Sequence, residues 1–181
     1  MTILNAEDSV IFIIDIQEKL LNAVFNKEII AKKSTILAQA SNILQVPVIL
    51  TEQYPKGLGN TVNTIKEHLS EHYLFEKTDF NALNDENVLN LLNKLGRKNI
   101  IVCGIETHIC VHQTVEALIQ NGFKVTVVKD SCSSRSEEEY LQALRVMETS
   151  GANIKTTEMI LFELLKGAKH PNFKEIQALI K

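Results

Sequence analysis

Short runs of β-branched and other apolar residues alternate along this chain with longer segments whose apolar residues recur at helical spacing. Several of the longer segments end at glycine, such as Gly96 and Gly122, which is a common stop signal for a helix. Strand, helix, glycine and strand in repetition is typical of βαβ units. The runs that we predict to be strands are Val10–Asp15, Val46–Thr51, Tyr73–Glu76, Asn99–Cys103, Lys124–Val128 and Asn153–Thr156.

The strand runs do not alternate between apolar and polar residues. In the first of them, Ile11, Phe12, Ile13 and Ile14 are all apolar, as expected where helices cover both faces of a parallel sheet. No linker, internal repeat or low-complexity tract divides the 181 residues. We therefore predict a single α/β domain over residues 1–181, with a parallel sheet flanked by helices.

Charge and cysteine content narrow the function classes. The formal net charge of −3 offers no basic field for phosphate backbones, so a nucleic-acid partner is disfavoured. The longest apolar stretch, Val10–Ile14, is far too short to span a bilayer, and the first residues do not resemble a secretory signal. The cysteine count is odd, at three, with no CxxC pair. We expect a cytoplasmic protein with free thiols and no membrane partner.

Three chemically useful side chains stand at or just beyond the ends of predicted strands: Asp15, Lys77 and Cys110. The carboxyl ends of parallel strands share one edge of a sheet, so these residues can converge there. Near a helix start and an ammonium group, Cys110 would have a lowered thiol pKa. Asp15 could accept the thiol proton, and backbone N–H groups of Glu106 and Cys110 could receive an oxyanion.

Each of these residues also has a purely structural interpretation. Cys110 could be a small buried apolar residue. Asp15 could be the N-cap of a helix over Gln17–Ala23, and Lys77 could be a solvated surface charge. Spacing alone does not decide between these readings.

Longer motifs add a family resemblance. The segment Val10–Gln17, with its Asp-x-Gln, resembles the first strand of the isochorismatase-like cysteine hydrolase superfamily, and Gly104–Cys110 resembles its nucleophile turn. Lys77 stands where that superfamily has its essential lysine. Three further segments resemble the isochorismatase domain-containing protein branch: Thr51–Gly59, Asp130–Ser136 and His170–Gln177.

The resemblance implies a three-layer sandwich with a six-stranded parallel sheet, a triad of Asp15, Lys77 and Cys110, and no cofactor. It implies hydrolysis of a small amide, ureido or ester-like substrate through an acyl-enzyme on Cys110, with amide-like C–N bonds as the main class of bond cleaved. It also implies a cis peptide between Ile105 and Glu106 that directs the N–H groups of Glu106 and Cys110 toward the oxyanion. Relatives of this kind are usually homo-oligomers.

Two departures from the superfamily pattern limit the substrate. Metal-dependent nicotinamidases carry Asp-x-His after the second strand, whereas this chain has Thr51-Glu52-Gln53. His68 and His72 lie four apart on an expected helix, but no third ligand follows at readable spacing. We therefore predict no metal. True isochorismatases lack a cysteine at the position of Cys110, so the superfamily name does not identify the substrate.

Four residues are weaker predictions for substrate contact: Gln17, Gln53, Tyr54 and Phe80. A helix-start role for Gln17 and a core role for Phe80 are the alternatives. The segment Gln53–Asn60 is either a pocket wall or an ordinary surface turn. Asp130 and Arg135 have the appearance of an ion pair or a helix-start device beside the site.

The leading hypothesis is thus a cysteine hydrolase with a small-molecule substrate. The alternative is a binding or scaffold protein that kept the fold and lost or repurposed the activity. The sequence does not identify the substrate, the number of subunits, or the roles of the four histidines His68, His72, His108 and His112.

Overall fold

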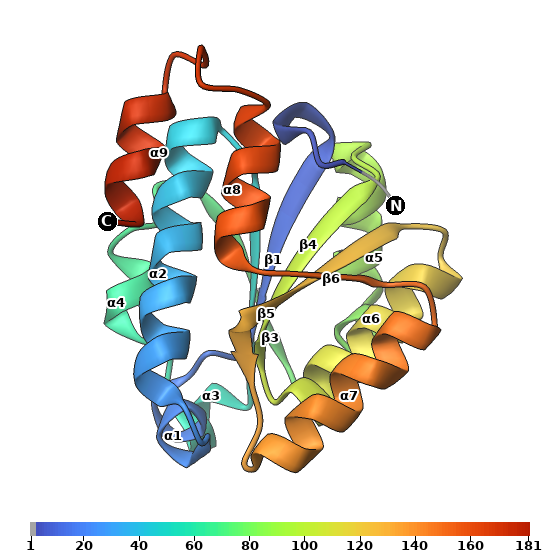
Figure 1. The fold of residues 1–181 in the computed structure, drawn as a ribbon. Coiled ribbons are helices and arrows are strands. Elements are labelled where there is room, and N and C mark those ends of the chain that lie inside the picture. Colours follow the sequence, from blue (N-terminus) through green and yellow to red (C-terminus); the bar gives the residue numbers. More distant parts are fainter. Residues whose placement is uncertain (1–2) are drawn as a thin grey trace.

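A computed structural model of the protein describes residues 3–181 and shows one parallel sheet between two layers of helices (Figure 1). The sheet has six strands in the order β3-β2-β1-β4-β5-β6, and every neighbouring pair is parallel. The predicted fold class is confirmed. The strands are β1 (Ser9–Ile14), β2 (Val48–Gln53), β3 (His72–Lys77), β4 (Asn99–Ile105), β5 (Lys124–Ser133) and β6 (Asn153–Lys155).

All six predicted strands exist, although some of their ends differ. The second strand begins at Val48 rather than Val46, because Val46 belongs to the end of the preceding helix: its N–H donates to the carbonyl oxygen of Ser41 at 2.9 Å. Gln45 closes that helix with φ of 54° in the left-handed region. At the other end, β2 continues to Gln53, which brings this residue to the edge where the site lies.

The helices lie on both faces of the sheet, as the uninterrupted apolar strands require. In Figure 1, α2, α8 and α9 cover one face, and α5, α6 and α7 cover the other. Short elements connect them or lie at the sheet edges. The helices are α1 (Glu18–Ala23), α2 (Lys27–Leu44), α3 (Pro55–Leu58), α4 (Asn63–Lys66), α5 (Glu86–Leu95), α6 (His112–Gln120), α7 (Glu137–Thr149), α8 (Thr157–Leu165) and α9 (Phe173–Leu179), and the single turns of helix are η1 (Ala6–Asp8), η2 (Ala82–Asn84) and η3 (Thr107–Val111).

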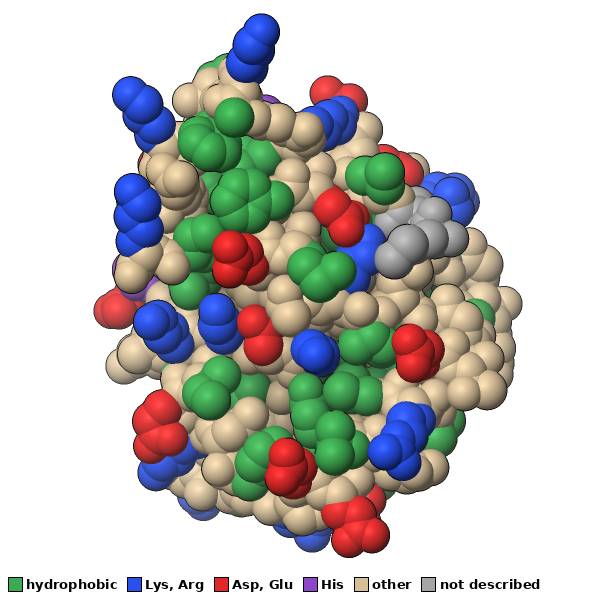
Figure 2. Space-filling model, in the orientation of Figure 1, with side chains coloured by type: hydrophobic (Ala, Val, Ile, Leu, Met, Phe, Trp, Pro, Cys, Tyr) green, Lys and Arg blue, Asp and Glu red, His purple; other side chains and the backbone are tan. Residues whose placement is uncertain are grey.

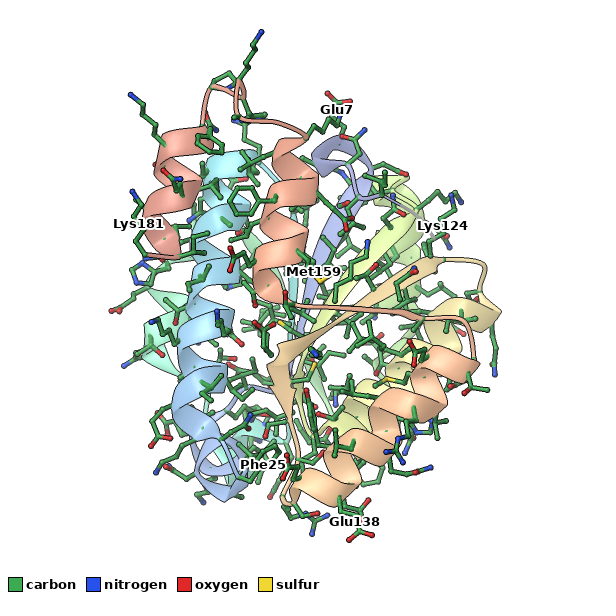
Figure 3. All side chains as sticks on the ribbon, viewed as in Figure 1. Glu7, Phe25, Lys124, Glu138, Met159 and Lys181 are labelled. Atoms are coloured by element: carbon green, nitrogen blue, oxygen red, sulfur yellow. The ribbon has the colours of Figure 1, made fainter. Side chains whose placement is uncertain are left out.

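The carboxyl ends of the strands form one edge of the sheet. Ile14 pairs with Thr51 on one side and with Gly104 on the other, and Gln53 pairs with Lys77. This edge lies at the lower end of the molecule in Figure 3, where Phe25 and Glu138 are labelled, whereas Glu7 and Lys124 lie at the opposite end. Side chains that follow β1, β2, β3 and β4 therefore gather at one place.

Gly104 allows the backbones of β1 and β4 to approach each other closely at this edge. Its φ is +145°, and a Cβ atom there would lie 2.2 Å from the carbonyl oxygen of Ile14. No side chain fits between the two backbones, so the glycine is what lets the end of β4 pass directly beside the end of β1. This contact brings the start of the Gly104–Cys110 turn beside the end of β1, which Asp15 follows.

The surface shows mixed charge. On the face drawn in Figure 2, lysine and arginine side chains are interspersed with aspartate and glutamate side chains. Within residues 3–181, no helix combines the length and the apolar composition needed to cross a bilayer.

Candidate active site

A buried ion pair lies at the carboxyl edge of the sheet. The Nζ atom of Lys77 lies 2.6 Å from Oδ2 of Asp15, and the two side chains are 4% and 0% exposed. The hydroxyl of Thr51 donates to the other carboxylate oxygen at 2.8 Å. Asp15 is therefore not a helix N-cap: Gln17 precedes α1 and no side chain caps it. The solvated reading of Lys77 is also wrong.

The Lys77 amino group is surrounded by hydrogen-bond acceptors. It donates to Asp15 and to Oε1 of Gln53, each at 2.6 Å, and it lies 3.3 Å and 3.4 Å from the carbonyl oxygens of Asp79 and Phe80. The three N–H donors of an ammonium group suit this set of acceptors. The contacts hold the Lys77 amino group in one place beside Asp15.

Gln17 and Gln53 hold this arrangement in place. Gln17 accepts from the backbone N–H of Gln53 at 2.7 Å and donates to the carbonyl oxygens of Gln53 and Gly59 at 3.0 Å and 2.6 Å. Gln53 in turn binds Lys77 through Oε1 and the carbonyl oxygen of Thr78 through Nε2, at 2.6 Å each. Both side chains are buried and their amides bind other protein groups, while their contact with a substrate stays a prediction.

Cys110 lies in η3, directly after β4, and is 5% exposed. Its thiol lies near enough to Asp15 and Lys77 that both groups change its pKa, so the three predicted residues do converge. Burial, followed by the negative charge of Asp15, raises the pKa of Cys110 to about 12, and the Lys77 ammonium only partly opposes this. The lowered pKa expected from the helix start is thus wrong: the resting side chain is a thiol next to a carboxylate.

The raised pKa makes a prediction about thiol reactivity. A shift from 9.0 to about 12 leaves roughly a thousandfold less thiolate at neutral pH than an unperturbed cysteine has. Because the neutral form is favoured, alkylation of Cys110 by iodoacetamide should rise about tenfold per pH unit between pH 7 and pH 9.5 without levelling off. Mass spectrometry of the Cys110 peptide measures the rate. A plateau below pH 8 would show that the thiolate is already formed near neutrality.

The turn before Cys110 offers a free backbone donor. The peptide bond between Ile105 and Glu106 is cis. The carbonyl oxygen of Glu106 accepts from the N–H groups of Ile109 and Val111 at 3.1 Å and 3.2 Å. The N–H of Glu106 donates to no residue among 3–181. This is the kind of unpaired donor that an oxyanion requires.

Glu106 and Arg135 form an ion pair beside this turn, with 2.8 Å between Oε1 and Nε. The expected partner of Arg135, Asp130, lies instead 3.7 Å from Nζ of Lys33 and accepts hydrogen bonds from the N–H and hydroxyl of Thr157. The prediction of a pair between Asp130 and Arg135 is therefore wrong. Asp130 stabilises the start of α8, and Arg135 belongs to the candidate site.

Tyr54 and Phe80 stand on the outer side of the Lys77 position. Their side chains are 55% and 52% exposed, so the core reading of Phe80 is wrong. The N–H of Tyr54 donates to the carbonyl oxygen of Lys77 at 2.9 Å. The ring of Tyr54 folds over Gly57, where a Cβ atom would lie 2.3 Å from Cε1 of the ring. The segment Gln53–Asn60 contains the short helix α3, and its role as a pocket wall stays a prediction.

The histidines do not form a metal site. The expected helix through His68 and His72 is wrong, because α4 ends at Lys66 and His72 is the first residue of β3. No group of three histidine, cysteine, aspartate or glutamate side chains among residues 3–181 is arranged to hold a metal ion.

The two histidines near Cys110 have local partners. Nδ1 of His108 lies 2.9 Å from the hydroxyl of Ser134, and Nε2 of His112 lies 3.7 Å from a carboxylate oxygen of Glu116. Both side chains are partly buried beside α7. Neither touches the ion pair of the candidate site.

The sequence analysis missed two contacts of the site. The hydroxyl of Thr51 donates to Asp15, and Arg135 pairs with Glu106. Strand order is the signal that would have found Thr51, because Thr51 pairs with Ile14 in the neighbouring strand and Asp15 is the next residue. Arg135 follows β5 in the same way, but the predicted strand stopped at Val128.

Comparisons with known proteins bear on the family and the fold of this chain. The model of the isochorismatase domain matches residues 9–159. The isochorismatase domain-containing protein 2 of Xenopus laevis is 43% identical over 178 residues, which cover 98% of this chain and 85% of that protein.

Two solved structures have the same fold. One is described as the MAR1 ribonuclease of Caenorhabditis elegans; it is 41% identical with a TM-score of 0.91, over 98% of this chain and 91% of that one. The other is the YcaC gene product of Escherichia coli, described as an octameric hydrolase of unknown specificity; it is 22% identical with a TM-score of 0.88, over 97% of this chain and 94% of that one. The domain match over most of the chain, together with relatives above 40% identity along its whole length, places this protein in the isochorismatase family, in the branch of the isochorismatase domain-containing proteins.

Proposed function

We propose that this member of the isochorismatase hydrolase family is a cysteine hydrolase that cleaves a small amide, ureido or ester-like substrate through an acyl-enzyme on Cys110. The observation that carries the proposal is the buried pair of Asp15 and Lys77, 2.6 Å apart, against the Cys110 thiol. Burying two charges is costly unless they are paired and hydrogen-bonded. Two well-packed apolar side chains at this edge would avoid that cost. A chemical role explains why an ion pair is found there instead.

The proton path follows from the pairing. Asp15 accepts the proton of Cys110 as the sulfur bonds to the substrate carbonyl carbon, and the carbonyl electron pair moves to oxygen. The N–H groups of Glu106 and Cys110 receive that oxyanion. When the tetrahedral intermediate collapses, the C–N or C–O bond breaks and the leaving group takes the proton from Asp15. Water then attacks the thioester, Asp15 accepts its proton, and Cys110 recovers this proton as the acid departs.

Lys77 acts as a fixed charge during these steps. Its ammonium is paired with the Asp15 carboxylate, and it lowers the pKa of Cys110 against the effects of burial and Asp15. When the proton moves from sulfur to Asp15, the negative charge moves from the carboxylate to the sulfur. Lys77 stabilises both distributions without moving, which reduces the cost of the transfer.

A second function is suggested by one relative's description as a ribonuclease. The net charge of −3 and the interspersed surface charges of Figure 2 do not favour a polyanionic substrate. We therefore propose a small molecule as the substrate and include RNA in the assays.

The octameric E. coli structure leads us to propose that this protein is a homo-oligomer. The three free cysteines lead us to propose a cytoplasmic location. A repurposed binding protein remains the alternative.

Replacing the nucleophile tests the proposal. A panel of small amides, ureides and esters, with RNA as a further arm, should contain a substrate whose turnover falls at least about a thousandfold in Cys110→Ala. Cys103→Ala is the matched control, since Cys103 is buried in β4 away from the ion pair, and it should keep its activity. Full turnover by Cys110→Ala on an identified substrate would refute a thiol mechanism. Binding of panel members without turnover would favour the repurposed binding protein.

A further inference from the structure

The ion pair of Glu106 and Arg135 follows the carboxyl ends of β4 and β5, beside the turn that contains Cys110. Ile105 pairs with Ser133 in the register of β4 and β5, so the residues that follow these strands lie next to each other. Glu106 is also the residue whose N–H is free to receive the oxyanion. Arg135 is thus tied, through a contact of 2.8 Å, to the residue beside the reacting carbonyl.

The two partners are exposed to very different degrees. The Glu106 side chain is 12% exposed and the Arg135 side chain is 62% exposed. The closest contact uses Nε, and one carboxylate engages one edge of the planar guanidinium. Within residues 3–181, Arg135 has no ion-pair or hydrogen-bond partner other than Glu106. A second edge with N–H donors is therefore open to a ligand.

Neighbouring acidic groups do not cancel this charge by direct pairing. The carboxylate of Asp15 is paired with Lys77. The first turn of α7 carries Glu137, Glu138 and Glu139, and none of these forms an ion pair with Arg135 in the described chain. Figure 3 shows Glu138 extending outward from the lower end of α7. The exposed group beside the Cys110 turn is a guanidinium, whose fork geometry matches a carboxylate.

Resting on the proposed hydrolase function, we propose that Arg135 binds a carboxylate group of the substrate. The substrate class is then an anionic amide or ureide whose reactive carbonyl lies a few bonds from its carboxylate. Glu106 is a positioning residue: its side chain holds the guanidinium beside the turn, and its backbone N–H donates to the oxyanion. The same turn thereby positions both the guanidinium of Arg135, through Glu106, and the thiol of Cys110.

Two alkylating reagents of similar size test this without knowledge of the substrate. Iodoacetate carries a carboxylate and iodoacetamide a neutral amide, and with both reagents the sulfur displaces iodide. The ratio of their rates at Cys110 cancels the fraction of thiolate. We would measure it by peptide mass spectrometry at pH 9 and low salt, where screening is weak, and divide it by the ratio for the same protein unfolded in urea.

We expect this normalised ratio to be five- to tenfold lower in Arg135→Gln than in wild type. The double variant Arg135→Gln, Glu106→Gln should stay at least fivefold below wild type, because the attraction comes from the guanidinium. Arg145→Gln, an exposed arginine on α7, should change it less than twofold. A double variant that returned to the wild-type ratio would show only repulsion by Glu106 and would overturn the proposal, as would equal effects of Arg135→Gln and Arg145→Gln. Either result would leave the hydrolase function standing, since that depends on turnover by Cys110→Ala.

Discussion

Asp15→Asn should lower turnover by about 10³- to 10⁴-fold while making Cys110 more reactive toward iodoacetamide at pH 7. The two effects have opposite signs because Asp15 has two roles. As the proton acceptor it is needed for attack on a substrate. As a negative charge beside the thiol it raises the pKa of Cys110. Without that carboxylate, the Cys110 thiolate becomes the natural partner of the Lys77 ammonium, so more thiolate forms.

The control for this experiment is Asp8→Asn. Asp8 lies at the opposite end of the sheet, where it accepts from the N–H of Lys98 and from Asn99 at 2.8 Å each. The variant Asp8→Asn should keep both the turnover rate and the rate of Cys110 alkylation within twofold of wild type. If Asp15→Asn lowered turnover and alkylation together, Asp15 would act by holding the fold of the site rather than by taking the proton.

Lys77→Met should destabilise the protein by about 3–5 kcal/mol, the usual cost of removing one partner of a buried ion pair. The change leaves the fully buried Asp15 carboxylate without a positive neighbour and leaves Oε1 of Gln53 without its donor. Alkylation of Cys110 should also slow, because Lys77 is the group that lowers its pKa. Urea unfolding followed by circular dichroism measures the change in the free energy of unfolding.

A double variant separates charge from packing. Asp15→Asn combined with Lys77→Met removes both charges and should recover part of the stability that Lys77→Met loses. Lys124→Met, at the exposed start of β5, should change the free energy of unfolding by no more than about 0.5 kcal/mol. If Lys77→Met unfolded at the wild-type urea midpoint, the pair would not be buried and charged as described.

The fold was predictable because the pattern that specifies it is local. Continuous apolar runs such as Val10–Ile14 indicate strands covered on both faces, and the helical segments between them require parallel neighbours. Strand ends were less accurate where a tertiary feature decides them. Val46 belongs to the closing turn of α2, and β5 continues to Ser133, beyond the apolar run that marks its beginning.

The convergence of Asp15, Lys77 and Cys110 was also predictable, since each follows a strand of one parallel sheet. The direction of the thiol pKa was not. A helix start and an ammonium lower it, but burial and a carboxylate raise it, and only the structure shows that the second pair of effects is larger.

The roles of the polar side chains around the triad depend on neighbours that are distant in sequence. Gln53 was expected at the substrate, yet its amide is engaged by Lys77 and Thr78. Asp130 and Arg135 were expected to form an ion pair or a helix-start device, yet Arg135 pairs with Glu106 because β4 and β5 end side by side, and Asp130 alone contacts the start of α8. Such choices between partners follow from register and rotamer, which the order of residues alone does not determine.

The covalent intermediate is the most direct test of the central claim. Wild-type protein mixed with an identified substrate and quenched in acid within the first turnovers should carry the acyl group on the peptide that contains Cys110, at a mass equal to substrate minus leaving group. The same peptide of Cys110→Ala should remain unmodified. Steady turnover by the wild type with the acyl group on another residue, or by Cys110→Ala itself, would contradict the account.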